Sequence, residues 1–236
     1  MKNNFFLFLA CLACFSIGVI HSCTKDAPSP SDPSAIRKTK SYTEEFENVP
    51  ALIPGGGWMG TTNVNDSEST IAPWTQGFNG QIKGDSINTY GFTAYSYKSS
   101  QDEFAYSYIE NEFSNFSTSS WLITPILCVK NGDKTSFYTR GDATGMYTDR
   151  MQVLLDHSTS SDIGDSLNSV GDFTTILFDI NPTQAPGGYP TSWTKYEYTF
   201  SGISGKVDTR IAFRHYVVHP KNARGVGIDL FKFEAN

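Results

Sequence analysis

Cysteine is scarce where this chain is expected to fold. Three of its four cysteines lie close to the N-terminus, at Cys11, Cys14 and Cys23. Residues 41–236 contain Cys128 alone, so a disulfide within that part of the chain is excluded. The neighbours of Cys128 are apolar, and this setting predicts an unreactive core thiol.

Positive charge and catalytic motifs are also lacking. The chain has 18 Lys and Arg against 24 Asp and Glu, a formal net charge of −6. Nucleic acid is not expected as a partner, because its binding depends on cations that neutralise phosphates. No His-Glu-x-x-His, Gly-x-Ser-x-Gly or Gly-Lys-Ser/Thr sequence occurs. We therefore expect a non-catalytic protein.

A single long apolar run is present, from Phe5 to Ile20, behind the positive charge of Lys2 and ahead of Ser22 and Cys23. This arrangement predicts a lipoprotein signal peptide over residues 1–22, with Cys23 as the lipid attachment site. The alternatives are a secretory signal cut elsewhere and an uncleaved anchor, although a membrane span needs about 20 apolar residues.

The predicted location is the outer membrane. The residues Thr24-Lys25-Asp26 resemble the short charged signal of lipoproteins exposed at the cell surface. The periplasmic face of the membrane is the alternative. Residues 23–40 are rich in Pro and Ser and predict a disordered tether. Residues 41–236 suit one domain with a sizeable core.

Short segments of alternating apolar and polar residues predict an all-β domain. In the segment 195–200, Tyr196, Tyr198 and Phe200 share one face, as in a strand buried on one side. Helical periodicity is missing, and about ten such segments predict an antiparallel jelly-roll sandwich. The clearest predicted strands are residues 89–97, 104–109, 120–127, 135–140, 150–155, 174–180, 195–200, 211–217 and 225–233. Residues 55–70 and 156–170 are predicted surface loops.

One carboxylate stands out in the last predicted strand. Alternation places Asp229 on the same face as Phe231 and Phe233. A carboxylate beside a core face is costly unless a cation or hydrogen-bond donors satisfy it. Ca²⁺ prefers such oxygen ligands. An arginine partner, Arg210 or Arg214, and a solvated Asp at a bulge are equally open.

Several motifs in their order resemble the choice-of-anchor J domain family, which is related to the cleaved adhesin domains of gingipain-type surface proteins. In the first half they are Ser120–Pro125, Asn131–Asp133, Ser136–Arg140 and Asp149–Val153. In the second half they are Val170–Thr175, Gly188–Thr194, Arg210–Arg214 and Gly227–Asp229. The resemblance implies a jelly-roll sandwich displayed outside the cell, here anchored by lipid on Cys23. It also implies calcium near the ends of the first and last strands, with Glu47 and Asp229 as candidate ligands.

The leading functional hypothesis is a surface binding or adhesion module for a glycan or an extracellular protein. Trp58 and Trp74 are its candidate stacking residues, because exposed aromatic rings bind sugars by apolar contact; the alternative places both in the core. A second hypothesis is a jelly-roll carbohydrate-active enzyme or enzyme accessory, which requires two carboxylates about 5 to 10 Å apart. A third is a structural envelope component that pairs through a sheet edge.

Overall fold

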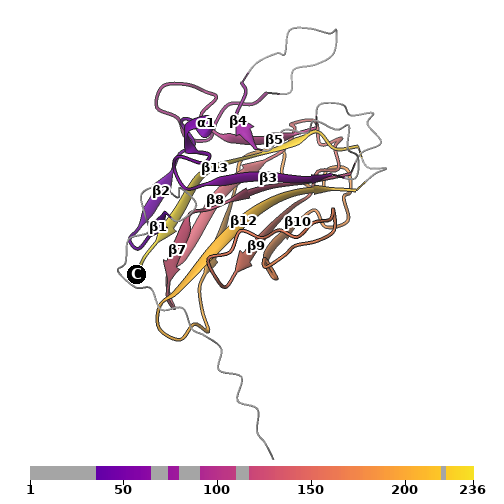
Figure 1. Ribbon diagram of the computed structural model, residues 1–236. Helices are drawn as coiled ribbons and strands as arrows, with labels where there is room; N and C mark the ends of the chain where they lie inside the picture. The colour runs from indigo at the N-terminus through magenta and orange to yellow at the C-terminus, as the bar shows by residue number, and fades with distance from the viewer. Residues whose placement is uncertain (1–35, 65–73, 80–90, 110–116, 219–221) are drawn as a thin grey trace, which may run out of the picture.

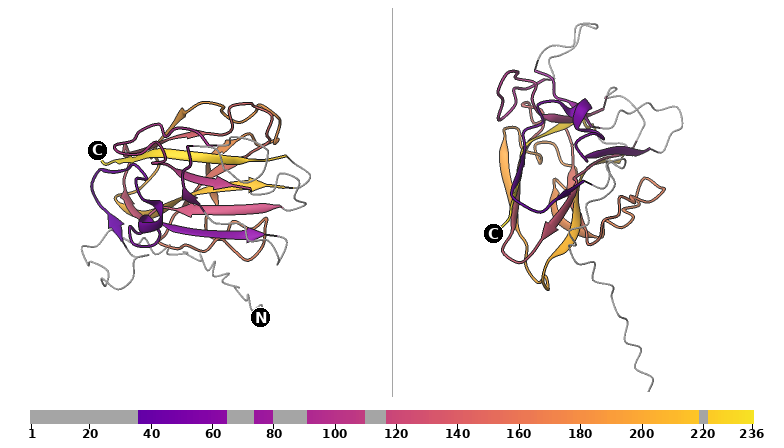
Figure 2. Two further views of the ribbon diagram at one scale, coloured as in Figure 1. Left: turned by 90° about the horizontal axis from the view of Figure 1, so that it is seen from above. Right: turned by 60° about the vertical axis from the view of Figure 1, so that its left-hand side comes forward.

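Two β-sheets face each other across one hydrophobic core (Figures 1 and 2). The computed structural model describes residues 36–64, 74–79, 91–109, 117–218 and 222–236. The first sheet contains β1 (Arg37–Lys38), β3 (Met59–Val64), β6 (Thr118–Ile123), β7 (Ile126–Val129), β9 (Met151–Asp156), β10 (Thr175–Ile180) and β12 (Val207–Val217). The second contains β2 (Tyr42–Glu44), β4 (Thr75–Gln76), β5 (Ala105–Tyr108), β8 (Lys134–Arg140), β11 (Thr194–Thr199) and β13 (Gly225–Glu234). The predicted all-β sandwich is confirmed.

The long strand β12 organises the first sheet. Its residues 212–217 pair with β6 and its residues 207–209 pair with β7 along the same edge, while residues 210–215 pair with β9 on the other edge. The predicted strand 120–127 is therefore two strands, separated at Thr124 and Pro125. Proline lacks the N–H that a continuous ladder needs.

The core lies between the sheets and follows the alternation read from the sequence. Phe213 of β12 packs edge-on against Phe137 of β8, with ring centroids 4.9 Å apart. Tyr196 of β11 stacks on the same Phe137 ring. These contacts confirm the predicted inward faces of β11 and β12.

Three local predictions need correction. Residues 37–38 belong to the fold and not to a tether, because β1 pairs in parallel with β7 and Arg37 binds Asp208 at 2.5 Å. Residues 59–64 of a predicted surface loop form β3, which pairs with β6. Cys128 is buried as predicted, but it is disulfide-bonded, so the prediction of a thiol is wrong.

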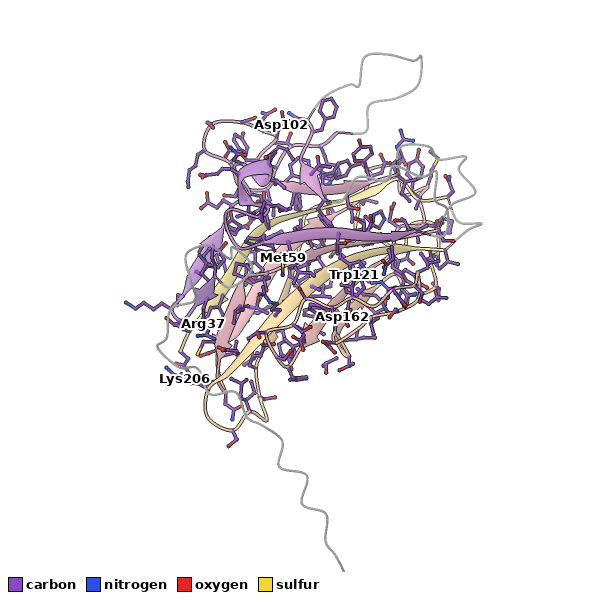
Figure 3. All side chains as sticks on the ribbon, viewed as in Figure 1. Arg37, Met59, Asp102, Trp121, Asp162 and Lys206 are labelled. Carbon is purple, nitrogen blue, oxygen red and sulfur yellow. The ribbon has the colours of Figure 1, made fainter. Side chains whose placement is uncertain are left out.

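The outer side of β6, β9 and β12, here called the covered face, lies beneath the loop 157–174. Phe173 of this loop is buried against Trp121 of β6. Arg214 of β12 donates to the carbonyl of Leu167 in the loop and to Gln152 Oε1 of β9. Figure 3 labels Asp162 of the loop close to Trp121. The residues between β9 and β10 lack regular structure, as predicted, but they serve as a cover.

Only one helix is found in the described parts of the chain, α1 (Val49–Leu52), which begins where Asn48 Oδ1 accepts the N–H of Ala51 at 3.1 Å. It is too short to cross a membrane, and no described helix is long and apolar enough to do so.

Candidate binding surface

The outer side of β8, β11 and β13, here called the open face, carries polar and aromatic side chains. Register places Lys195 of β11 and Asp229 of β13 on either side of Tyr138 of β8. Paired residues of an antiparallel sheet point to the same face. The outward side chains of this face include Lys134, Tyr138, Lys195, Glu197 and Lys232.

An exposed tyrosine lies flat on this face. The ring of Tyr95 stacks on that of Tyr138, with centroids 3.7 Å apart and planes 15° from parallel. Tyr95 is 44% exposed and Tyr97 is 48% exposed. A side-chain hydrogen bond with Tyr138 raises the pKa of Tyr95, so the Tyr95 hydroxyl stays protonated at neutral pH. We call the two stacked rings, Tyr95 and Tyr138, the tyrosine platform.

Glu103 holds the turn that follows the platform. Its carboxylate accepts the backbone N–H groups of Lys98, Ser99 and Ser100 at 2.6, 3.0 and 2.8 Å. The hydroxyl of Ser99 also donates to it. Hydrogen bonds from the Ser99 hydroxyl and these N–H groups lower the pKa of Glu103 to about 2. Figure 3 shows the neighbouring Asp102 at the end of the sandwich that carries α1.

Asp229 lies beneath residues 95–100, here called the platform segment, and is fully buried. Its Oδ2 accepts the N–H of Ser96 at 2.8 Å, and its Oδ1 accepts the N–H of Leu230 at 2.6 Å. Burial raises the pKa of Asp229 to about 7, and the nearby carboxylate of Glu45 adds to the shift.

Asp229 does not share the face of Phe231 and Phe233, and the bulge left open as an alternative is present, although the carboxylate is buried and not solvated. The register of β13 shifts between Asp229 and Lys232, and Leu230 has a positive φ of 48°. This bulge changes the alternation. Phe231 therefore faces the core, while Asp229 shares the outer side with Tyr138.

The charges of the open face are largely paired. Glu197 binds Lys195 at 2.7 Å and Lys134 at 3.2 Å. These two ammonium groups lower the pKa of Glu197, Lys195 having the larger effect. The platform is thus bordered by both signs of charge and not by a field of one sign.

The calcium ligands implied by the resemblance are not assembled. Glu47 and Glu45 both bind the ammonium of Lys98, at 2.5 and 3.2 Å. Asp229 is satisfied by backbone N–H groups. Within the described ranges, no three His, Cys, Asp or Glu side chains are grouped to hold a metal ion. Calcium binding therefore stays a prediction.

Neither predicted stacking tryptophan reaches the surface. Trp58 is fully buried, where its Nε1 donates to Tyr42 Oη at 2.9 Å and its ring meets Phe46 edge-on. Trp74 is also buried and donates to the carbonyl of Ser120 at 3.3 Å. Both are core residues, so their assignment as a stacking surface is corrected. Cys23 lies outside the described residues.

The sequence contains a weak signal for the platform. Tyr95 and Tyr97 alternate with small or charged residues in the stretch Tyr95–Ser100. Alternation of this kind predicted a strand at 89–97, but no described residue of that range is in a strand. The stacking partner Tyr138 is distant in sequence, and only the fold brings the rings together.

A buried polar chain links the two sheets. Ser107 of β5 lies 2.9 Å from His215 Nδ1, and Asp149 Oδ1 lies 3.0 Å from His215 Nε2. All three side chains are at most 2% exposed. The order serine, histidine, carboxylate matches that of a hydrolase triad, but burial keeps Ser107 from any substrate. His215 is the hydrogen-bonded core histidine of a link between the sheets.

Solved structures share this architecture. The K3 cleaved adhesin domain of Lys-gingipain from Porphyromonas gingivalis w83 matches with 17% identity and a TM-score of 0.50, over 84% of this chain and 99% of that one. The K1 domain from strain W83 matches with 19% identity and a TM-score of 0.47, over 84% and 99%. A carbohydrate-binding module of the β-sandwich superfamily matches with 10% identity and a TM-score of 0.41, over 83% and 62%. No family model and no curated protein matches. The K3 likeness shows the fold, which is that of the cleaved adhesin domains.

Proposed function

We propose that this protein is a non-catalytic glycan-binding module displayed at the outer surface of a bacterial envelope. The observation that carries the proposal is the tyrosine platform, where Tyr95 is 44% exposed and stacked flat on Tyr138. A ring held flat on a rigid strand offers its free face without losing further side-chain freedom.

The surroundings of the platform suit an uncharged glycan. Sugar hydroxyls donate and accept hydrogen bonds, and the border of the platform supplies a carboxylate, Glu197, and an ammonium, Lys195. Because these charges pair with each other, they attract a polyanion weakly. A neutral hexose stacked on Tyr95 has both kinds of partner within the same face.

Binding to a glycan array, followed by titration of the best ligand, tests this proposal. In the full-length protein, Tyr95→Ala is expected to weaken binding about tenfold or more, a loss of about 1.4 kcal/mol. Tyr95→Phe keeps the ring and is expected to retain most of the affinity. Ile176→Ala removes a residue that is 54% exposed on β10 and is the matched control. No glycan bound by the wild type, or equal binding by Tyr95→Ala, would overturn the proposal.

We propose that lipid on Cys23 anchors the protein to the outer membrane and so displays it at the surface. Metabolic labelling with a radioactive fatty acid is expected to mark the wild type and the Cys14→Ser control, but not Cys23→Ala. A thioether at Cys23 excludes this sulfur as the disulfide partner of Cys128. Mass spectrometry of the unreduced protein distinguishes a lipid thioether at Cys23 from a disulfide. A Cys23–Cys128 peptide pair would contradict lipidation.

Membership of the choice-of-anchor J family is part of the same proposal. Its motifs lie on the strands that form the sandwich: Ser136–Arg140 forms most of β8, and Gly227–Asp229 lies on β13, beside it. The fold of the K3 adhesin domain supports this assignment. Adhesion is the role in which such a module would act.

A further inference from the structure

The carboxylate of Asp229 lies where the tyrosine platform joins the second sheet. Asp229 and Tyr138 are register partners on β13 and β8. The N–H of Ser96, the residue after Tyr95, donates to Asp229 Oδ2 at 2.8 Å. One carboxylate thus lies beside the lower ring of the platform and binds the backbone that carries the upper ring.

We infer that Asp229 is a positioning residue of the binding surface, whose carboxylate fastens the Tyr95–Ser96 backbone to β13 and so fixes Tyr95 over Tyr138. Its effect on ligand binding rests on the proposed function. The fastening itself is independent of any ligand.

The local backbone of β13 orients the Asp229 side chain toward the Tyr95–Ser96 backbone. The bulge turns Asp229 outward although Phe231, two residues later, faces the core. Leu230 adopts a φ of 48°, which is unfavourable for a residue with a branched side chain. In this conformation the N–H of Leu230 donates to Asp229 Oδ1 at 2.6 Å. The bulge and the carboxylate therefore support each other.

A carboxylate suits this position because the groups around it are donors. In its ionised form it has acceptors only, whereas the amide of asparagine would turn an NH₂ group toward one of the two N–H groups. Above the pKa of Asp229 of about 7, where the carboxylate is ionised, hydrogen bonds to it are also about twice as strong as neutral ones. No cation contacts Asp229 among the described residues; the nearby ammonium of Lys98 binds Glu45 and Glu47.

The other end of the platform segment, at residues 98–100, is held by a different carboxylate. Glu103 binds the backbone of residues 98–100, whereas Asp229 binds at Ser96. This division provides a matched pair of variants. Asp229→Asn is expected to release the platform end of the segment, and Glu103→Gln the turn at residues 98–100.

Hydrogen exchange of the full-length protein tests the fastening without a ligand. In the wild type, the Ser96 amide is expected to exchange at least about tenfold more slowly than an open amide. Asp229→Asn is expected to remove most of this protection, while Glu103→Gln leaves it and exposes residues 98–100. Amides of β12 serve as the control for the global fold. An unprotected Ser96 amide in the wild type overturns the inference, even if Asp229→Asn fails to fold.

Two further measurements separate the inference from the proposed function and from metal binding. If the wild type binds a glycan, Asp229→Asn is expected to weaken binding, by less than Tyr95→Ala does, without altering Tyr138. If no glycan binds, the proposed function fails while the exchange result still decides the inference. Thermal unfolding with and without Ca²⁺ is the last test: a calcium-dependent rise that Asp229→Asn abolishes would assign Asp229 as a cation ligand and overturn its role as a fastening.

Discussion

The outer faces of the two sheets differ in burial, although both carry aromatic and basic side chains. On the covered face, Trp121 and Arg214 are at most 2% exposed beneath the loop 157–174. On the open face, Tyr95 and Lys195 reach solvent. The covered face contributes a second small core, and the open face remains accessible to a ligand.

The difference lies in the connecting segments and not in the strands. The loop after β9 brings Ile163 and Phe173 down onto Trp121. On the other side, the segment before β5 covers one end of the second sheet with Phe92, and its Tyr95 lies over Tyr138 with one face free. A covering loop buries aromatic rings for stability, whereas a partial cover leaves a ring on a rigid support.

Removing the cover is expected to have the largest effect. Phe173→Ala leaves a cavity over Trp121 and is expected to lower the free energy of unfolding by about 3 to 4 kcal/mol. Denaturant unfolding measures this loss. An effect below about 1 kcal/mol would mean that the loop 157–174 adds little to the core and that the two faces are less different than their burial indicates.

Arg214→Ala on the covered face is the next largest change. Burial lowers the pKa of Arg214 to about 10, and its guanidinium donates to Ser119, Gln152 and Leu167. Its removal leaves Gln152 Oε1 and the Leu167 carbonyl without this donor, while Ser119 Oγ keeps the indole N–H of Trp121, and it is expected to cost about 2 to 3 kcal/mol. The matched change on the open face, Lys195→Ala, is expected to cost less than about 0.5 kcal/mol, because exposed ion pairs contribute little. Equal losses in the two variants would contradict the comparison.

A fall in pH is expected to weaken the turn at residues 98–100, because it protonates Glu103. Its pKa is lower in the folded protein, so the unfolded chain binds more protons and stability rises with pH between the two values. This contribution is present above the usual glutamate pKa of about 4.3 and is lost as the pH falls toward about 2. When the pH is lowered from 7 to 3, the unfolding midpoint is expected to fall less steeply for Glu103→Gln than for the wild type. Parallel curves for the two proteins would exclude this role.

Tyr95→Ala is expected to have a small effect on stability while removing the binding surface. The lost stacking on Tyr138 contributes about 1 kcal/mol or less, since one face of the ring is already in water. The same unfolding measurement compares it with Phe173→Ala. A loss as large as that of Phe173→Ala would make Tyr95 a core residue and remove the basis for a binding role.

The amino-acid sequence alone determined the sandwich, because alternation of apolar residues decides which side of a strand is buried. Phe213, Tyr196 and His215 lie on the predicted faces for this reason. Alternation failed at Asp229, where a single bulge reverses the side; its only mark in the sequence is the change of parity between Ile228 and Phe231, which left a bulge open as an alternative.

The candidate site required the tertiary structure. Trp58 follows three glycines that predict a surface loop, yet strands distant in sequence enclose both Trp58 and Trp74. Tyr95 and Tyr138 lie 43 residues apart in numbering and meet only because β13 places the segment after Ala94 against β8. Periodicity reports the two sides of one strand, whereas exposure depends on which loops the whole chain folds over each sheet. For that reason the sequence determined the architecture, and only the tertiary structure decided which aromatic residues were left for a ligand.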